Sequence, residues 1–226
     1  MPEPSTIRLD KLLDHPAVID AVADVNLELK ERIAYQPPVC DVFKSDFSTL
    51  VTDPQYQCEI DKDAHRQLSH IIANTVQRVE GSDDAADDVK KNYRKARNIG
   101  IVFSGGPSPG GHNVIAGLFD AAKKINPQTR IFGFLMGPDG IIDGDHMELT
   151  HEQVDQYRNV GGFTMIKTGR TKIDDRKKMN LSRETCKQLE LDALVVVGGD
   201  DSNTNAAFLA QNMFEDGVQV IGVPKT

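Results

Sequence analysis

Two adjacent carboxylates, Asp200 and Asp201, follow an apolar run at 193–197 and two glycines. Valine dominates the run and turn-forming residues bound it, which predicts a buried strand of a parallel sheet. Ligands of open α/β sheets bind beyond the carboxyl ends of such strands. Neighbouring carboxylates repel each other, and a sheet edge that faces a cleft is expected to screen this repulsion poorly, so we expect a cation or a polar substrate here. Mg²⁺ fits because it combines one or two carboxylates with waters and substrate phosphates. The alternative is that one aspartate caps a helix starting near Asn203 while the other is solvated.

A glycine-rich turn at 104–113 follows a second apolar run and contains Gly105, Gly106 and His112. Glycines let a backbone approach a phosphate closely, and the next helix offers amide donors at its start. The turn therefore predicts an anion cradle, although a tight turn without a ligand explains it equally well. It fits neither the Walker pattern nor Gly-x-Gly-x-x-Gly. We interpret His112 as a structural hydrogen-bonding group.

A third glycine turn, at 161–162, leads to Arg170. Its guanidinium could form paired hydrogen bonds to phosphate oxygens, so we predict that Arg170 reaches into the site. The basic residues that follow it are interpreted mostly as the exposed face of a helix; they are Lys172, Arg176, Lys177 and Lys178. A fourth turn, Pro224-Lys225-Thr226, follows another predicted strand and ends the sequence, from which we expect further material on the same or a separate chain.

The positions of these turns require alternating strands and helices. Apolar patterns predict strands at 99–103, 131–135, 193–197 and 218–223, and helices at 111–125, 151–159, 182–189 and 203–214. Such alternation predicts an α/β domain over 99–226, with a mainly parallel Rossmann-like sheet and helices on both faces. The sheet brings the four turns to one edge.

Residues 1–98 do not show the alternation of strands and helices, and their pattern predicts a largely helical extension. Helices are expected over 12–33 and over 63–79, where apolar residues share one face. Pro37-Pro38 interrupts helical continuity. The acidic and then basic residues of 83–97 suit a solvated helix, because their order complements the helix dipole.

Composition excludes several classes of function. The net charge of -8 over 226 residues, without a basic face, argues against nucleic acid as a partner. Cys40, Cys58 and Cys186 are too few and too widely spaced for a disulfide framework or a zinc site, which favours a reducing cytoplasm. No apolar run approaches the roughly 20 residues that span a bilayer, so no membrane association is expected.

Taken together, the four turns resemble the phosphofructokinase family, and within it the pyrophosphate-dependent branch of the long, N-terminally extended type. The resemblance covers 99–226, the N-terminal portion of such an enzyme. It implies reversible, Mg²⁺-dependent phosphoryl transfer from pyrophosphate to the 1-hydroxyl of fructose 6-phosphate, giving fructose 1,6-bisphosphate in glycolysis or gluconeogenesis. It also implies a homo-oligomer, a dimer or larger.

The resemblance assigns roles to individual residues. Gly105, Gly106 and Gly199 would contact the donor phosphates, Asp200 would hold Mg²⁺, and Arg170 would steady the transferring phosphoryl group. Asp201 and Lys225 would select the donor: relatives that use ATP carry glycine at both positions, whereas a carboxylate repels a nucleotide's α-phosphate and an ammonium stabilises charge on pyrophosphate. Thr226 would open the sugar-binding segment.

One departure from the family pattern is that the aspartate expected shortly after Thr226, the catalytic base, is absent. Most sugar-phosphate ligands are missing with it, so this chain alone is expected to be inactive. The alternatives are an ATP-dependent phosphofructokinase, a related kinase acting on NAD or lipids, and a non-catalytic regulatory subunit that binds phosphometabolites.

Overall fold

The computed structural model describes residues 30–32, 34–36, 38–53, 60–72 and 76–225. The chain divides into Met1–Pro37 and a larger compact unit, Pro38–Thr226. The predicted helix over 12–33 lies almost entirely outside the described residues, and so does Thr226. Within the described residues, no helix has both the length and the apolar character needed to cross a bilayer.

A five-stranded sheet organises residues 98–226 in the order β5-β4-β3-β6-β7. The strands are β3 (Asn98–Ser104), β4 (Arg130–Phe134), β5 (His146–Glu148), β6 (Ala193–Gly198) and β7 (Gln219–Pro224). Neighbouring strands are parallel except β4 and β5, which are antiparallel. The predicted mainly parallel sheet is therefore confirmed, whereas the short edge strand β5 was not predicted.

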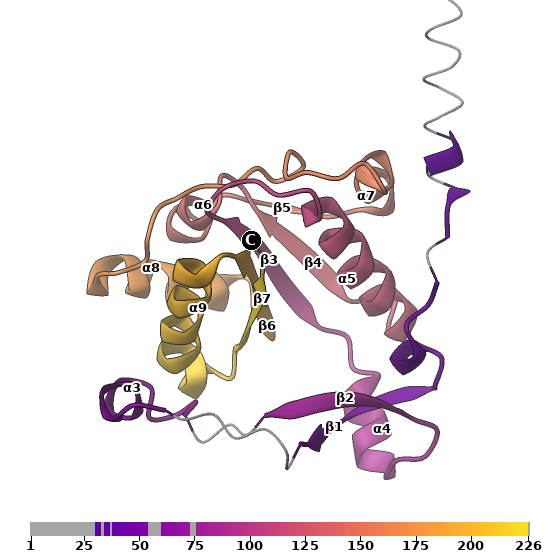
Figure 1. The fold of residues 1–226 in the computed structure, drawn as a ribbon, viewed down its shortest axis with the longest axis horizontal. Coiled ribbons are helices and arrows are strands. Elements are labelled where there is room, and N and C mark those ends of the chain that lie inside the picture. Colours follow the sequence, from indigo (N-terminus) through magenta and orange to yellow (C-terminus); the bar gives the residue numbers. More distant parts are fainter. Residues whose placement is uncertain (1–29, 33, 37, 54–59, 73–75, 226) are drawn as a thin grey trace, which may run out of the picture. The chain divides into compact units, whose positions relative to one another are not determined.

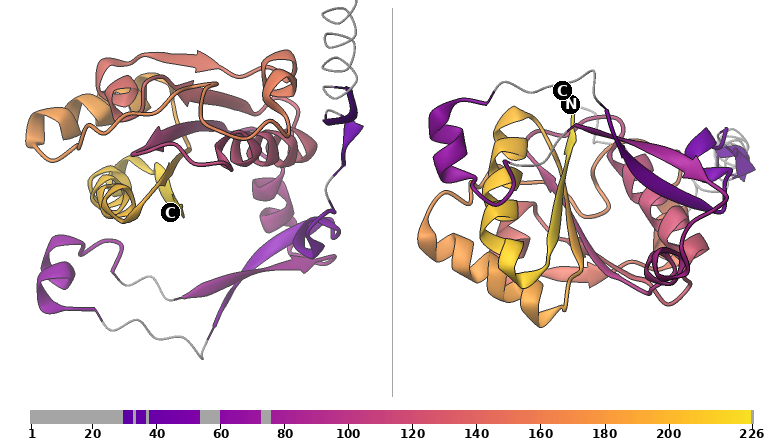
Figure 2. Two further views of the ribbon diagram at one scale, coloured as in Figure 1. Left: turned by 45° about the horizontal axis from the view of Figure 1, so that its top comes forward. Right: turned by 90° about the horizontal axis from the view of Figure 1, so that it is seen from below.

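Helices cover both faces of this sheet, as predicted. α5 (Gly111–Ile125) and α7 (His151–Tyr157) contribute Ile115, Phe119 and Val154 to the core on one face. On the other face the core includes Ile141, Cys186 and Leu209 from α6 (Pro138–Asp143), α8 (Arg176–Gln188) and α9 (Asp200–Met213). Figures 1 and 2 show α5 on one side of the strands and α8 and α9 on the other. Alternate residues of β3, β4 and β6 supply the two cores.

One helix of this domain was not predicted, and two others begin earlier than predicted. α6 was not predicted, and α8 begins at Arg176, six residues before the expected start at 182, because Asp175 caps it by accepting a hydrogen bond from the Lys178 amide. α9 begins at Asp200 rather than near Asn203, because Gly199 takes the N-cap position. A short 3-10 turn, η2 (Phe214–Asp216), continues α9.

The described part of the extension is less helical than predicted. It contains η1 (Asp41–Phe43), α3 (Lys62–Gln67) and α4 (Asp87–Tyr93), and also an antiparallel pair of strands, β1 (Phe47–Thr52) and β2 (Gln77–Ser82). Among the described residues the predicted helix over 63–79 was wrong after Gln67: residues 68–72 are not helical, and residues 77–79 lie in β2, where β-branched Val79 favours extended backbone and β1 supplies a partner strand. α4 confirms the predicted charge order. The domain boundary between 98 and 99 stays a prediction.

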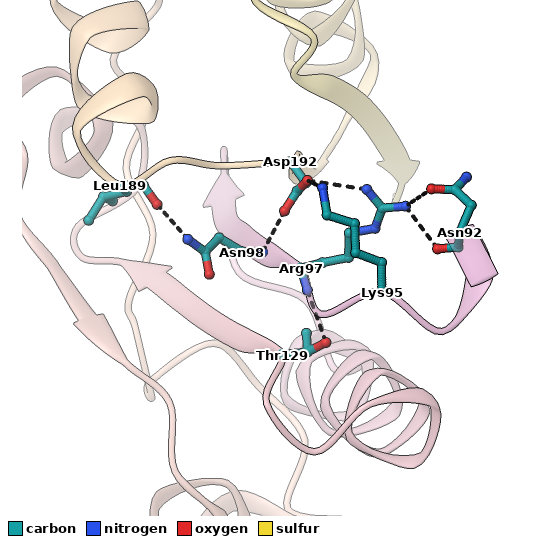
Figure 3. A network of polar contacts seen from close by, with 7 residues as sticks. All are labelled: Asn92, Lys95, Arg97, Asn98, Thr129, Leu189 and Asp192. Carbon is teal, nitrogen blue, oxygen red and sulfur yellow. Dashed lines mark hydrogen bonds and ion pairs between the residues drawn. The ribbon is translucent and has the colours of Figure 1, made fainter.

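A polar network closes the amino end of the sheet (Figure 3). Asp192, just before β6, accepts hydrogen bonds from the Asn98 amide at 2.8 Å and from Arg97 at 3.2 Å. Arg97 also donates to Asn92, and Asn98 donates to the Leu189 carbonyl. These groups bind one another and nearby backbone atoms, so this end joins strands and helices.

Candidate functional site

Three strands end side by side at the opposite edge of the sheet. Ser104 of β3 is in register with Gly198 of β6, and Gly198 is in register with Pro224 of β7. The turns that follow these strands therefore lie together, as the sequence predicted for parallel strands. We call Gly105, Gly106, Arg170, Gly199, Asp200, Asp201 and Lys225 the carboxyl-edge site.

The turn at Gly105 and Gly106 lies between two cations. Gly105 has a φ of +90°, which favours glycine, and its amide donates to the Gly169 carbonyl at 2.8 Å. A Cβ placed on Gly105 would lie 3.8 Å from Lys225 Nζ, and one placed on Gly106 would lie 3.3 Å from Arg170 Nη2. The structure thus brings together a close backbone approach, a guanidinium and an ammonium, the groups that bind phosphate oxygens.

Lys225 is held by backbone and ring contacts. Its amide donates to the Gly198 carbonyl at 2.9 Å, which extends the β6–β7 pairing by one residue. Its Nζ lies 5.9 Å from the centroid of the Phe163 ring, which stacks on Phe103 in the core. The backbone of Lys225 also passes close to Gly199, where a Cβ would lie 3.9 Å from its carbonyl oxygen. Arg170, Lys225 and the three glycines therefore surround one stretch of sheet edge.

Asp200 and Asp201 occupy the first turn of α9, and both are exposed. Asp200 Oδ1 accepts a hydrogen bond from the Asp201 amide at 2.9 Å, and Asp201 Oδ2 lies 3.0 Å from Lys172 Nζ. Neither aspartate is the N-cap, so the alternative in which one of them caps α9 was wrong. The prediction that their repulsion is poorly screened also needs correction, because water reaches both carboxylates and Lys172 offsets one charge.

The donor set suits Mg²⁺. Among the described residues no group of three or more His, Cys, Asp or Glu side chains could hold a metal ion. Mg²⁺ does not require such a group, because it is held by one or two carboxylates and completed by waters and phosphates. Asp200, with Asp201 next to it at the start of a helix, offers hard oxygen ligands of this kind.

Several residues that shape the site were missed by the sequence reasoning. Ser202 Oγ donates to Ser104 Oγ at 2.9 Å, a buried contact that joins α9 to the end of β3. Asn203 Nδ2 donates to the carbonyls of Gly198 and Gly199, and Thr168 Oγ1 donates to the Gly105 carbonyl. No spacing signal marks these polar residues, since their partners are distant in the sequence or are backbone atoms.

Lys172 is the exception among the four basic residues that were interpreted mostly as an exposed helical face. It lies four residues before α8 begins, and its Nζ pairs with Asp201, whereas Arg176, Lys177 and Lys178 do lie in the first turn of α8. The pattern of basic residues alone could not separate these two situations.

His112 is a structural group, as predicted. It lies in the first turn of α5 with 1% of its surface exposed, and its Nε2 accepts a hydrogen bond from the Met165 amide at 3.0 Å. Burial lowers the pKa of His112, which favours the neutral ring that can accept this bond. The His112 amide donates to the Gly162 carbonyl, so the start of α5 has fewer free amides for an anion than expected.

A cavity of about 740 Å³ adjoins the carboxyl-edge site. It is lined by both Lys172 and Asp201, and it extends along α8 and α9 past Asn205 and Phe208. Its volume lies in the range that holds small organic ligands.

Comparison with known proteins gives one family. The model of the phosphofructokinase family matches residues 98–226. A pyrophosphate--fructose 6-phosphate 1-phosphotransferase of Porphyromonas gingivalis is 56% identical over 57% of this chain and 24% of its own length. The enzyme of the same name from Treponema pallidum is 43% identical over 89% of this chain and 37% of its own. The chain thus spans about a quarter to a third of these relatives.

Solved structures agree on the fold. A pyrophosphate-dependent phosphofructokinase of Nitrosospira multiformis has a TM-score of 0.52 at 24% identity, covering 58% of this chain and 34% of that one. The phosphofructokinase of Pichia pastoris in the T-state has a TM-score of 0.50 at 20% identity, covering 67% and 18%. At these identities the likeness shows the α/β fold.

Proposed function

Because the chain belongs to the phosphofructokinase family, we propose that its carboxyl-edge site binds magnesium pyrophosphate as the phosphoryl donor. The acceptor is fructose 6-phosphate, the product is fructose 1,6-bisphosphate, and the transfer is reversible. The names of the relatives from Porphyromonas gingivalis and Treponema pallidum support these substrates. The observation that carries the proposal is the Gly105–Gly106 turn between Arg170 and Lys225, at the edge where Asp200 and Asp201 begin α9.

Each residue of the site has a task in this proposal. The backbone at Gly105, Gly106 and Gly199 lets phosphate oxygens approach closely. Arg170 binds two oxygens of the transferring group, and Lys225 stabilises charge that builds up on the departing phosphate. Asp200 would hold Mg²⁺, which neutralises phosphate charge when bound. Thr226, by family resemblance, opens the sugar-binding segment.

Asp201 selects the donor in this proposal. A nucleotide would have to place its α-phosphate and nucleoside beyond the two terminal phosphates, where a carboxylate repels negative charge and occupies volume. Pyrophosphate has no such extension. The pair with Lys172 reduces the net charge at this position, so we assign exclusion to the volume of the side chain as well as to its charge.

Calorimetric titration of the chain with magnesium pyrophosphate and with magnesium ATP tests the donor. We expect binding of pyrophosphate and binding of ATP at least tenfold weaker, a difference of about 1.4 kcal/mol. Removing Mg²⁺ with a chelator is expected to weaken pyrophosphate binding, because the negative charge of pyrophosphate and that of Asp200 would then repel each other without a cation to neutralise them. Equal binding of both donors would contradict donor selection, and no binding of pyrophosphate would contradict the site.

ATP-dependent transfer is the second candidate, and the cavity beside Asp201 favours it, since its volume would accept a nucleoside. Asp201→Gly separates the candidates. If Asp201 excludes the nucleotide, this variant gains affinity for ATP, whereas an enzyme already built for ATP gains none. In a longer chain that supplies the catalytic base, an aldolase-coupled assay of fructose 1,6-bisphosphate formation extends the same comparison to turnover.

We also propose an assembly of two or more chains in the cytoplasm. Plant relatives carry names that identify them as alpha and beta subunits, which supports an assembly. The three cysteines without a pairing pattern support a reducing compartment. Light scattering with a sizing column tests the assembly, and a single protomer mass at micromolar concentration would contradict it.

A further inference from the structure

The segment 169–173 carries Arg170 and crosses from the end of β3 to α9. Exposure alternates along it: Arg170 and Lys172 are exposed, Gly169 and Thr171 are partly buried, and Ile173 is buried. Such alternation is typical of a strand-like segment whose successive side chains point to opposite sides. We call residues 169–173 the cation strap.

The odd-numbered residues fasten the cation strap at three places. The Gly169 carbonyl accepts from the Gly105 amide at 2.8 Å, and Thr171 Oγ1 donates to Asp139 Oδ2 of α6 at 2.9 Å. At the far end both backbone groups of Ile173 bind one side chain. The Ile173 amide donates to Asn205 Oδ1 at 3.0 Å, and Asn205 Nδ2 donates to the Ile173 carbonyl at 2.8 Å.

The even-numbered residues face the site. Arg170 Nη2 lies beside Gly106, and Lys172 Nζ pairs with Asp201 at 3.0 Å. Asn205 follows Asp201 by four residues, so both lie on the same face of α9. α9 therefore carries the two carboxylates and also binds the cation strap, which carries Arg170 and Lys172. In this way α9 positions both sets of charges relative to each other.

We propose that Asn205 is a positioning residue for the donor site. Through its two hydrogen bonds to Ile173 it sets the strap on α9, so that Arg170 meets the transferring phosphate and Lys172 reaches Asp201. A carboxamide suits this task because it presents a donor and an acceptor side by side, as one residue's carbonyl and amide require. The role at the phosphate rests on the function proposed above, whereas the anchoring of the strap does not.

Hydrogen–deuterium exchange of the ligand-free chain tests the anchoring. Asn205→Ala removes both hydrogen bonds, and Asn205→Leu removes them while keeping a side chain of similar size. Both variants are expected to raise exchange in peptides covering 169–173 severalfold over the unchanged chain. Asn180→Ala is the matched control, because Asn180 is exposed and lines the same cavity. Unchanged exchange in both Asn205 variants would overturn the anchoring.

A double-mutant cycle on the affinity for magnesium pyrophosphate tests the positioning. Arg170→Ala and Asn205→Leu are expected to weaken binding about tenfold or more each, and the double variant no further than Arg170→Ala alone, because one acts through the other. Fully additive losses would overturn the positioning, since a merely structural role does not couple to Arg170. Absence of binding by the unchanged chain would overturn the proposed function, and exchange would still decide the anchoring.

Discussion

The two ends of the central sheet use polar side chains in different ways. At the amino end, Asp192, Arg97 and Asn98 bind one another and nearby backbone groups (Figure 3). At the carboxyl end, Arg170, Asp200 and Asp201 are exposed, and glycines replace bulky residues in the turns. Charges that are saturated hold elements together, whereas charges left at an open edge remain available to a ligand.

The difference is not absolute, because the carboxyl end also contains saturated contacts. The Ser104–Ser202 hydroxyl pair is buried, and Asn203 and Asn205 bind backbone atoms. These polar residues lie beneath the exposed charges and fix the elements that carry them. The carboxyl edge therefore uses one set of polar residues to hold its elements in place and another to face a ligand, whereas at the amino end the same residues do both the binding and the covering.

The largest effect is expected at the amino end. Asp192→Ala leaves the Asn98 amide without its acceptor and removes one of the acceptors of Arg97, which keeps only Asn92, and we expect the free energy of unfolding to fall by about 2–3 kcal/mol. Chemical denaturation measures it. Asp192→Asn is the control, because it keeps an acceptor for the Asn98 amide and should lose about half as much. If the folded Asp192→Ala chain lost more free energy of pyrophosphate binding than of unfolding, the two ends of the sheet would not act independently.

At the carboxyl end we expect the opposite outcome. Arg170→Ala should weaken binding of magnesium pyrophosphate by about 10- to 100-fold, since a charged hydrogen-bond donor is lost, and change the unfolding free energy by less than about 0.5 kcal/mol. Titration calorimetry and denaturation measure the two quantities. Arg176→Ala is the matched control, because Arg176 is an exposed arginine at the start of α8, outside the carboxyl-edge site, and should leave affinity unchanged. A large loss of stability in Arg170→Ala would remove the distinction between the ends.

The structural layer beneath the site gives a smaller effect. Ser202→Ala leaves Ser104 Oγ buried without its partner, and we expect a loss of about 1 kcal/mol in unfolding free energy. Replacing both serines by alanine should cost little more than the single change, because no unpaired hydroxyl remains. If the double variant lost twice as much unfolding free energy as Ser202→Ala, the two serines would act independently.

The smallest effect is a dependence of stability on pH. Burial lowers the pKa of His112 in the folded chain, so the unfolded chain binds the extra proton more readily. The stability contributed by the neutral ring is complete above the pKa of His112 in the unfolded chain, near 6.5, and is lost as pH falls below that value. A protonated Nε2 can no longer accept the hydrogen bond from the Met165 amide. Thermal unfolding between pH 7.5 and pH 5.5 should show a loss of about 1 kcal/mol or less. His112→Gln should reduce that loss; an unaltered slope would contradict it.

Most of the central sheet could be predicted because its signals are local. Runs such as 193–197 consist of residues that favour buried strands, and glycines bound them on the carboxyl side. The short elements α6 and β5 escaped prediction because six and three residues give too little periodicity. The helix expected over 63–79 failed at 77–79 because the pairing of β2 with β1, a contact between distant segments, decided the backbone conformation there.

The sequence by itself determined where the glycine-rich and charged turns follow strands, and that parallel strands bring such turns to one edge. Gly105, Gly106 and Arg170 were singled out from residue type and position, and Lys225 from the family resemblance; the structure places them together. Only the tertiary structure decided how their charges are distributed: Lys172 pairs with Asp201, and Asn205 grips Ile173. The physical reason is range. Strand propensity and turn chemistry act over a few neighbouring residues, whereas hydrogen bonds and ion pairs between residues some thirty positions apart exist only after the chain has folded.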